Sequence, residues 1–193
     1  MPEMQCTIMH MRGDSLSPEL LAQIDTIFFE ASSRPFIQGP ERDVFRERWL
    51  GRYLRGGSDV LLVAMDGSAP VPTVAGYLVG ALEDPSSQPR FADIPYFARE
   101  FRDLCRGYSA HLHINFAPAY RSKGFGAQLI SAFAARAAKA GAWGMHVVTS
   151  KTARNVGFYT RCGFIQLGEA TSNGGDLIFL GKCLPVSAGR SIA

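Results

Sequence analysis

The stretch HLHINFAPAYRSKGFGAQLI, residues 111–130, carries the strongest structural signal in the chain. Polar and apolar residues alternate in its first part, which predicts a strand over Ala110–Phe116. Its last part has apolar residues at helical spacing, which predicts a helix over Gly124–Ala140 that ends at Gly141. A strand that runs through a glycine turn into a long helix is typical of α/β proteins.

The turn between this strand and this helix reads Arg121-Ser122-Lys123-Gly124-Phe125-Gly126. The first N–H groups of a helix lack partners and lie at the positive end of its dipole, and glycines let an anion approach the backbone. With the charges of Arg121 and Lys123, the turn is predicted to cradle a pyrophosphate. It lacks the Gly-Lys-Ser/Thr end of a Walker loop and the third glycine of a dinucleotide fingerprint. The alternative is a tight turn without a ligand.

The rest of the chain predicts further strands and helices on both sides of this stretch. Ser17 and Pro18 give an N-cap and a first helical position. The predicted helices are 18–32, 41–55, 124–140 and 152–162, and the predicted strands are 7–11, 59–65, 73–82, 110–116, 145–149, 164–167 and 177–180. The helix over 41–55 is expected to bury Val44, Phe45, Trp49 and Tyr53. This order predicts an α/β fold whose mixed, mostly antiparallel central sheet is flanked by helices.

The length and composition predict one ordinary domain over residues 1–184, with a flexible tail over 185–193. The net charge is only +3, and the densest basic stretch, residues 42–55, is interleaved with acidic residues, so nucleic-acid binding is not expected. The N-terminal sequence has no export signal, and no apolar stretch reaches membrane length. A membrane partner is therefore not expected, and the predicted location is the cytoplasm.

The cysteines and histidines do not form a metal-binding pattern. None of the four cysteines is paired in a CxxC spacing, and the four histidines form no cluster with them. No metal site is predicted, and the cysteines are expected to be free thiols.

Two blocks of the chain resemble the acetyl-CoA-binding core of the GNAT superfamily of N-acetyltransferases. The first is the strand and glycine turn already described, and the second is Asn155-Val156-Gly157-Phe158-Tyr159 with Cys162-Gly163-Phe164 behind it. The HLHI strand and the long aromatic segment before it are also similar to the acetyltransferase-like domains associated with O-GlcNAcases and to their free-standing bacterial relatives. The resemblance implies the GNAT fold and acetyl-CoA as cosubstrate.

The resemblance also implies roles for individual residues. The backbone amides that would hold the pyrophosphate belong to Arg121, Ser122, Lys123, Gly124, Phe125 and Gly126. Backbone groups of Ile114, Asn115 and Phe116 would pair with the pantetheine arm like an added strand. Asn155 would contact the cofactor, and Tyr159 would face the thioester sulfur.

Acetyl transfer to an amine needs a base for the amine and an acid for the departing thiolate. Tyr159 matches the family position for the acid, and a phenol stays protonated at neutral pH; the alternative is a core tyrosine. His111, His113 and Asn115 share one face of their strand, on which His113 is the candidate base. Asn115 cannot be a base and would orient substrate or water. The alternative for the histidines is a hydrogen-bonded, half-buried pair. Cys162, at a helix end, is not expected to be a nucleophile.

These residues predict an acetyl-CoA-dependent N-acetyltransferase that moves the acetyl group directly to an amine in a ternary complex. The acceptor is either a small molecule or a lysine of a protein or peptide. The alternative is a catalytically silent CoA-binding or protein-interaction module, and a homodimer remains open.

The segment Glu83–Ser109 is long for a connection in a compact domain, and long connections often have a function. It contains a helix-like stretch, Tyr96–Arg106, and the aromatic residues Phe91, Tyr96, Phe97 and Phe101. We expect this insert, residues 83–109, to pack on the domain and to wall the acceptor site. The alternatives are a satellite core away from the site and a dimer interface.

Overall fold

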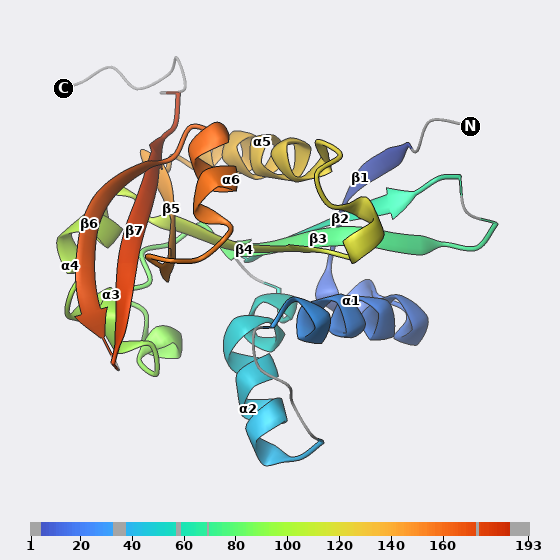
Figure 1. Ribbon diagram of the computed structural model, residues 1–193, viewed down its shortest axis with the longest axis horizontal. Coiled ribbons are helices and arrows are strands. Elements are labelled where there is room, and N and C mark those ends of the chain that lie inside the picture. The colour runs from blue at the N-terminus through green and yellow to red at the C-terminus, as the bar shows by residue number, and fades with distance from the viewer. Residues whose placement is uncertain (1–4, 33–37, 57–58, 69, 173, 186–193) are drawn as a thin grey trace. The chain divides into compact units, whose positions relative to one another are not determined.

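A computed structural model describes residues 5–32, 38–56, 59–68, 70–172 and 174–185 of the chain. These residues form two compact units (Figure 1). Unit 1 comprises residues 1–80 and 113–133, and unit 2 comprises residues 81–112 and 134–193. Strand β4, Ala110–Phe116, and helix α5, Phe125–Lys139, each contribute residues to both units.

The described strands form one seven-stranded sheet in the order β1-β2-β3-β4-β5-β7-β6. β4 runs parallel to β5, whereas the pairs β1–β2, β5–β7 and β6–β7 are antiparallel. The remaining strands are β1 Cys6–Met11, β2 Asp59–Asp66, β3 Thr73–Ala81, β5 Gly144–Ser150, β6 Ile165–Ser172 and β7 Gly175–Cys183. The prediction of an α/β fold with a mixed, mostly antiparallel sheet is thus confirmed.

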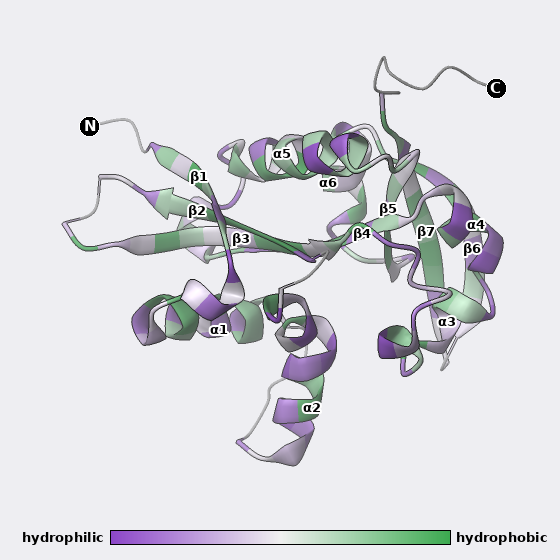
Figure 2. Ribbon diagram, turned by 180° about the vertical axis from the view of Figure 1, so that it is seen from behind, coloured by the Kyte–Doolittle hydropathy of each residue, from purple (hydrophilic) through white to green (hydrophobic). Residues whose placement is uncertain are grey.

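Unit 1 begins with β1 and helix α1, Pro18–Ala31. The Ser17 side chain accepts a hydrogen bond from the Leu20 amide, as predicted for an N-cap, and α1 buries Ile24, Ile27 and Phe28. Within this unit, α1 and the first turns of α5 lie on opposite sides of β2 and β3 (Figures 1 and 2). The two faces of these strands are therefore covered by different helices.

The second helix, α2, is shorter than the predicted helix over 41–55. It spans Pro40–Trp49, and a 3-10 turn, Gly51–Leu54, follows it. The helix ends because Leu50 leaves helical geometry with φ −138° and is fully buried. Tyr53 is buried as predicted. Val44 is 58% exposed, and Phe45 and Trp49 are only half-buried, so the prediction that all three are buried was wrong. Figure 2 shows that α2 is mostly hydrophilic.

Unit 2 is built on β5, β7 and β6, which pair in register from Gly144–Cys183 to Ser150–Leu177 and from Ile165–Gly181 to Ser172–Gly175. The segment before β4 packs on these strands through Phe91, Phe97 and Phe101, each no more than 3% exposed. The Phe101 ring lies 5.5 Å from that of Phe179 in β7. The expectation that the insert packs rather than being solvated is met, because its aromatic rings are part of a core.

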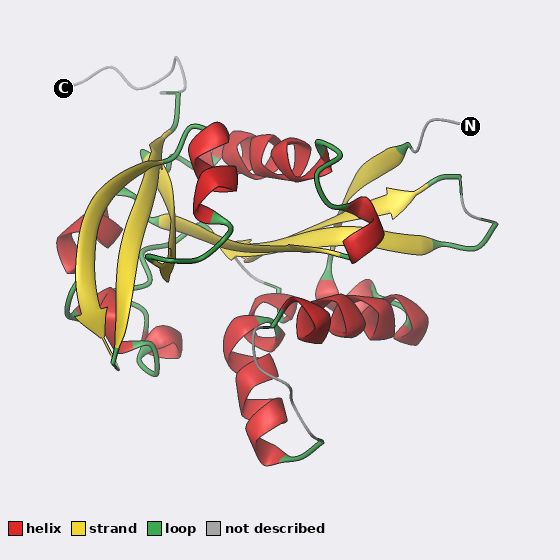
Figure 3. Ribbon diagram, in the orientation of Figure 1, coloured by secondary structure: helices red, strands yellow, loops and turns green. Residues whose placement is uncertain are grey.

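Two predicted helices of unit 2 differ from the observed ones (Figure 3). The stretch Tyr96–Arg106 is broken into α3, Pro95–Ala98, and α4, Arg102–Gly107, and the Phe101 amide donates to the Tyr96 carbonyl across the break. The expected helix over 152–162 is limited to α6, Val156–Arg161. The last two strands are longer than predicted, and Asn173 of the expected turn lies outside the described residues, as does most of the expected tail.

Candidate functional site

The glycine turn of unit 1 follows β4 through a short 3-10 turn, Pro118–Tyr120, and leads into α5. Two of its residues have left-handed backbone geometry, Ser122 with φ 60° and Gly124 with φ 85°. Ser122 is the only non-glycine residue with positive φ in the described part of the chain. A turn with such residues directs successive N–H groups toward one side, which is the geometry of an anion-binding nest.

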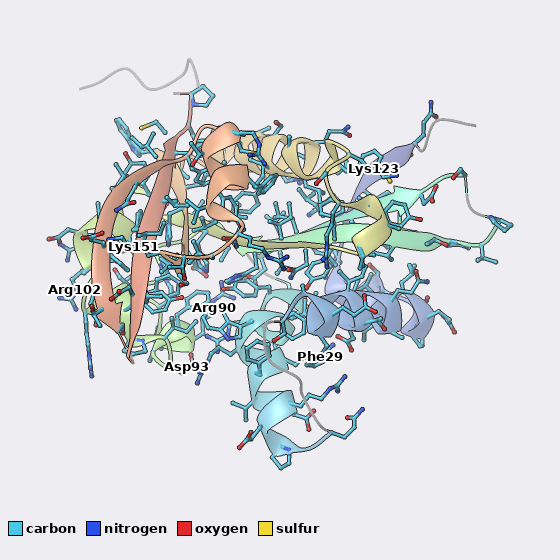
Figure 4. All side chains as sticks on the ribbon, in the orientation of Figure 1. Phe29, Arg90, Asp93, Arg102, Lys123 and Lys151 are labelled. Carbon is cyan, nitrogen blue, oxygen red and sulfur yellow. The ribbon has the colours of Figure 1, made fainter. Side chains whose placement is uncertain are left out.

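The hydrogen bonds of α5 begin at this turn. The Gly124 carbonyl accepts from the amides of Ala127 at 3.1 Å and Gln128 at 3.4 Å. The amides of Phe125 and Gly126 come before the first complete helical turn, so no carbonyl of a preceding turn is available to them. Lys123 lies beside this end of α5 (Figure 4). Exposed amides, the positive end of a helix dipole and a lysine together suit a phosphate group.

Two side chains brace the turn within unit 1. The Tyr120 hydroxyl donates to Asp66 Oδ2 at 2.6 Å, and this hydrogen bond is the main cause that raises the pKa of Tyr120 to about 12. Asp66 ends β2, is 8% exposed and also accepts from Ser68 through its other oxygen. On the next residue, Arg121 Nε donates to the Phe116 carbonyl at 2.9 Å. The sequence pattern had assigned Arg121 only a charge near the phosphate, and the structure adds this bracing contact.

The end of β4 lies beyond its ladder with β5. That ladder comprises the pairs Ala110–Met145 and His111–His146. Ile114, Asn115 and Phe116, which are predicted to pair with the pantetheine arm, follow it in the strand. Of these three, Phe116 uses its carbonyl for Arg121, and its ring packs against Gly76, where a Cβ atom would come within 2.3 Å. Ile114 and Asn115 are half-buried.

The two polar side chains at this end of β4 are each in contact with a buried tyrosine. His113 Nε2 lies 3.2 Å from the hydroxyl of Tyr53, and the Trp49 ring meets the imidazole edge-on at 5.3 Å. Asn115 Nδ2 donates to the hydroxyl of Tyr77 at 3.0 Å. Tyr77 is fully buried, and burial raises its pKa, so its hydroxyl stays protonated. His113 and Asn115 are thus held in position by α2, the 3-10 turn and β3.

His111 is placed differently from the other residues of this face. It is 2% exposed and lies in unit 2 between the rings of Phe91 at 4.8 Å and Phe97 at 5.3 Å. Its neighbour across the ladder, His146, is fully buried, and burial lowers the pKa of His146 to about 4. These two histidines belong to a core, so His111 is more deeply buried than the half-buried pair with His113 that was the alternative to catalysis.

Unit 2 carries the second predicted block. Tyr159 in α6 is 4% exposed and packs against Phe164 at 5.4 Å, and burial raises its pKa. Asn155 precedes α6 without a capping hydrogen bond from its side chain. It is exposed, and its Oδ1 accepts a hydrogen bond from Thr149 of β5 at 3.1 Å.

Other predicted features concern metals, thiols and membranes. Among the described residues there is no group of three or more histidine, cysteine or acidic side chains suited to a metal ion. The four cysteines are unpaired thiols, and burial raises the pKa of Cys162, which fits its exclusion as a nucleophile. Over the same residues, no helix has the length and apolar character needed to cross a membrane.

Sequence reasoning missed the residues that position the predicted ones. Asp66, Tyr77 and Arg46 lie in elements far from the two blocks, and no motif marks them. The only signal that could have found them is the alternation of β3, which points Tyr77 to the face opposite Gly76.

Comparisons with known proteins match both blocks. The family model described as an acetyltransferase (GNAT) domain matches residues 60–166. Among solved structures, "Crystal structure of SsHAT" has a TM-score of 0.65 at 20% identity and covers 93% of this chain and 98% of its own. A putative acetyltransferase, yncA from Salmonella typhimurium with its cofactor acetyl-CoA, has a TM-score of 0.59 at 18% identity, covering 97% and 99%.

The NatC complex bound to Gag peptide and CoA has a TM-score of 0.62 at 16% identity and covers 94% of this chain and 100% of its own. No curated protein matches the sequence. At these identities the structural likeness shows the fold, and the family model shows the family.

Proposed function

Because this chain belongs to the GNAT acetyltransferase family, we propose that it is an acetyl-CoA-dependent N-acetyltransferase that transfers the acetyl group directly to an amine in a ternary complex. The observation that carries the proposal is the braced turn over residues 121–126, whose left-handed Ser122 and Gly124 expose amides at the start of a fifteen-residue helix. A non-glycine residue in left-handed geometry is uncommon, which supports a role for this turn beyond connecting β4 to α5.

The proposed acetyl-CoA site uses residues of both blocks. The amides of Arg121–Gly126 hold the pyrophosphate, and backbone groups of Ile114–Phe116 pair with the pantetheine arm. Because the Phe116 carbonyl already accepts from Arg121, that pairing relies on Ile114 and Asn115. Asn155 contacts the cofactor. Structures of family relatives that contain acetyl-CoA or CoA support this part of the proposal.

The proposed chemistry assigns one proton to each of two residues. The nitrogen of the acceptor amine forms a bond to the acetyl carbonyl carbon, and His113 accepts the proton that this nitrogen loses. Asn115 orients the acceptor. The bond between that carbon and sulfur breaks, and Tyr159 donates its proton to the departing thiolate. Burial keeps the Tyr159 phenol neutral until that moment, since its raised pKa disfavours the phenolate.

The wider organisation also belongs to this proposal. Residues 1–184 act as one catalytic domain, the insert at 83–109 walls the acceptor site, and the protein works in the cytoplasm. On the likeness of its HLHI strand to O-GlcNAcase-associated domains, the chain is proposed to belong to that branch of the family. The acceptor is a small-molecule amine or a lysine of a peptide or protein.

The test measures binding and turnover separately. Thermal unfolding with acetyl-CoA reports binding, and release of free CoA thiol in the presence of an amine panel reports transfer. We expect both signals. A thermal shift without any thiol release would favour a silent CoA-binding module, and the absence of a shift with both acetyl-CoA and CoA would contradict the proposal.

A further inference from the structure

Unit 1 contains a half-buried ion pair that the proposed chemistry does not use. Arg46 of α2 donates through Nε to Asp25 Oδ1 of α1 at 2.8 Å, and the two side chains are 25% and 27% exposed. The exposed pair Arg12–Asp14, at 73% and 64%, is in contrast almost fully solvated. The Arg46–Asp25 pair is therefore partly desolvated, and its interactions are stronger than those of a surface pair.

Most of the hydrogen-bonding capacity of Arg46 is unused. A guanidinium has five N–H donors, and among the described residues only Nε of Arg46 has a partner, namely Asp25. Its two Nη groups keep the flat, forked arrangement that binds a carboxylate through two parallel hydrogen bonds. Arg42, one turn earlier in α2, is different, because its guanidinium stacks on Phe29 at 3.6 Å and donates to Gln38.

The ion pair lies close to the polar end of β4. Trp49, three residues after Arg46 in α2, meets the imidazole of His113 at 5.3 Å, and residues three apart share a face of a helix. The neighbouring strand β3 contributes the hydroxyl of the fully buried Tyr77. That hydroxyl accepts the hydrogen bond from Asn115 Nδ2. His113 is two residues from Asn115 on the same face of β4, so Arg46 belongs to the helix that contacts this face. We refer to Arg46, Tyr77 and Asn115 as the polar group of unit 1.

Asn115 has one acceptor atom, Oδ1, to offer a substrate. Its Nδ2 is engaged by Tyr77, and its Oδ1 has no partner among the described residues. An amide oxygen accepts hydrogen bonds and can therefore orient an amine N–H. The polar group therefore offers Asn115 Oδ1 as an acceptor to an amine N–H and the two Nη groups of Arg46 as donors to an anion.

We propose that Arg46 binds a carboxylate of the acceptor, so that the substrate class is amines that also carry a carboxylate, as amino acids do. This inference rests on the proposed function and refines its acceptor. The carboxylate meets the Nη groups of Arg46, the amine N–H meets Asn115 Oδ1, and the amine proton passes to His113. A polyamine brings a second positive charge to Arg46 in place of the carboxylate, and it is disfavoured.

The experiment compares matched amines on the wild-type protein with acetyl-CoA. The probes are the standard α-amino acids, the corresponding α-carboxamides, which keep the amine and lose the carboxylate, and spermidine. We expect kcat/KM to be at least about tenfold higher for the best carboxylate than for its carboxamide. Arg46→Gln should remove this ratio by lowering only the carboxylate reaction, and Arg42→Gln on the same helix should retain it.

The ratio of kcat/KM between a carboxylate and its carboxamide, measured on one protein sample, does not depend on the fraction of folded molecules. A destabilised Arg46→Gln variant therefore still gives a valid result. Equal rates for both forms, a preference for spermidine, or an unchanged ratio in Arg46→Gln would overturn the inference while leaving acetyl transfer intact. If no amine is acetylated, the proposed function fails. Saturation-transfer NMR of the same probes then decides the inference: carboxylate binding that Arg46→Gln abolishes supports it, and no binding overturns it.

Discussion

The hydroxyl of Tyr120 donates a 2.6 Å hydrogen bond to the carboxylate of Asp66, a residue 54 positions earlier in the chain. Tyr120 directly precedes the turn over 121–126, so this bond connects the start of the turn to the end of β2. A short hydrogen bond to an ionised carboxylate is stronger than a neutral one. The turn is therefore held in its left-handed geometry by a contact that lies outside it.

Removal of the Tyr120 hydroxyl should weaken cofactor binding. In Tyr120→Phe the turn loses its tether, and we expect the acetyl-CoA Kd to rise about tenfold, with a loss of about 1 kcal/mol in unfolding free energy. Titration calorimetry and urea unfolding measure these quantities. Ser68→Ala removes another hydrogen bond to the same carboxylate and should leave the Kd unchanged. Equal Kd values for Tyr120→Phe and wild type would show that the tether does not position the turn.

A side chain at Gly124 should abolish binding by changing the backbone. Gly124 has φ 85°, and a Cβ atom there would meet no atom within 4 Å, so Gly124→Val acts through strain and not through a clash. At 100 times its Kd, acetyl-CoA should stabilise the wild type by about 2.7 kcal/mol, and Gly124→Val should lose this shift. Gly107→Ala is the control, since it has the same open space without positive φ. A retained thermal shift in Gly124→Val would contradict the assignment of the turn.

The phenol of Tyr159 is expected to act in turnover and not in binding. Tyr159→Phe should lower kcat by roughly 10²- to 10⁴-fold, because the thiolate loses its acid, while the acetyl-CoA Kd stays the same. Tyr108→Phe, which removes a hydroxyl near Cys183 in the same unit, serves as the control. Unaltered turnover in Tyr159→Phe would leave the residue a packing tyrosine beside Phe164.

His113 and His111 should respond in opposite ways to the same substitution. His113 is half-buried at the end of β4, so His113→Gln should lower kcat by roughly 10²-fold or more with little change in stability. His111 is enclosed by Phe91 and Phe97, so His111→Gln should lower the unfolding free energy by about 1–3 kcal/mol. Steady-state kinetics corrected for folded fraction, with urea unfolding, separates the two effects. If His113→Gln kept full turnover, another group would have to be the base.

His146 should make the stability dependent on pH. Burial lowers its pKa in the folded protein to about 4, below the ordinary histidine value of 6.5, so between these values the unfolded chain binds a proton that the folded chain does not. Stability is therefore full above pH 6.5 and falls as the pH decreases toward 4, with a slope that approaches roughly 1 kcal/mol per pH unit. His146→Phe, which keeps a ring to stack on Phe179, should flatten this slope in urea unfolding series. Parallel pH profiles for both proteins would show that another group is responsible.

The features that depend on neighbouring residues could be predicted from the sequence. The β4 strand, the start of α5 and the N-cap at Ser17 agree with prediction because alternation, glycine placement and capping chemistry are properties of neighbouring residues. Helix ends were less accurate, since they depend on which residue becomes buried. Leu50 ends α2 in the core, and Gly51 directly after it is a helix-stop signal that the prediction of a helix over 41–55 did not use.

Besides the helix ends, the sequence pattern did not distinguish the surroundings of residues that share one face of a strand. Alternation places His111 with His113, but the two meet different surroundings, because Phe91 and Phe97 come from an insert whose path the pattern does not contain. The same limit hides the tyrosines of the site. Tyr53 and Tyr77 reach His113 and Asn115 only after the chain has folded.

The edge-on contact of Trp49 with the imidazole of His113, at 5.3 Å, also gives the protein an optical property. The chain has two tryptophans, and the other, Trp143, is 66% exposed. Indole emission is quenched by a nearby protonated imidazole, so Trp143→Phe leaves a single fluorophore that reports the charge of His113. Emission from Trp49 in a stopped-flow instrument would then test, without a label, the proposal that this histidine takes up the amine proton.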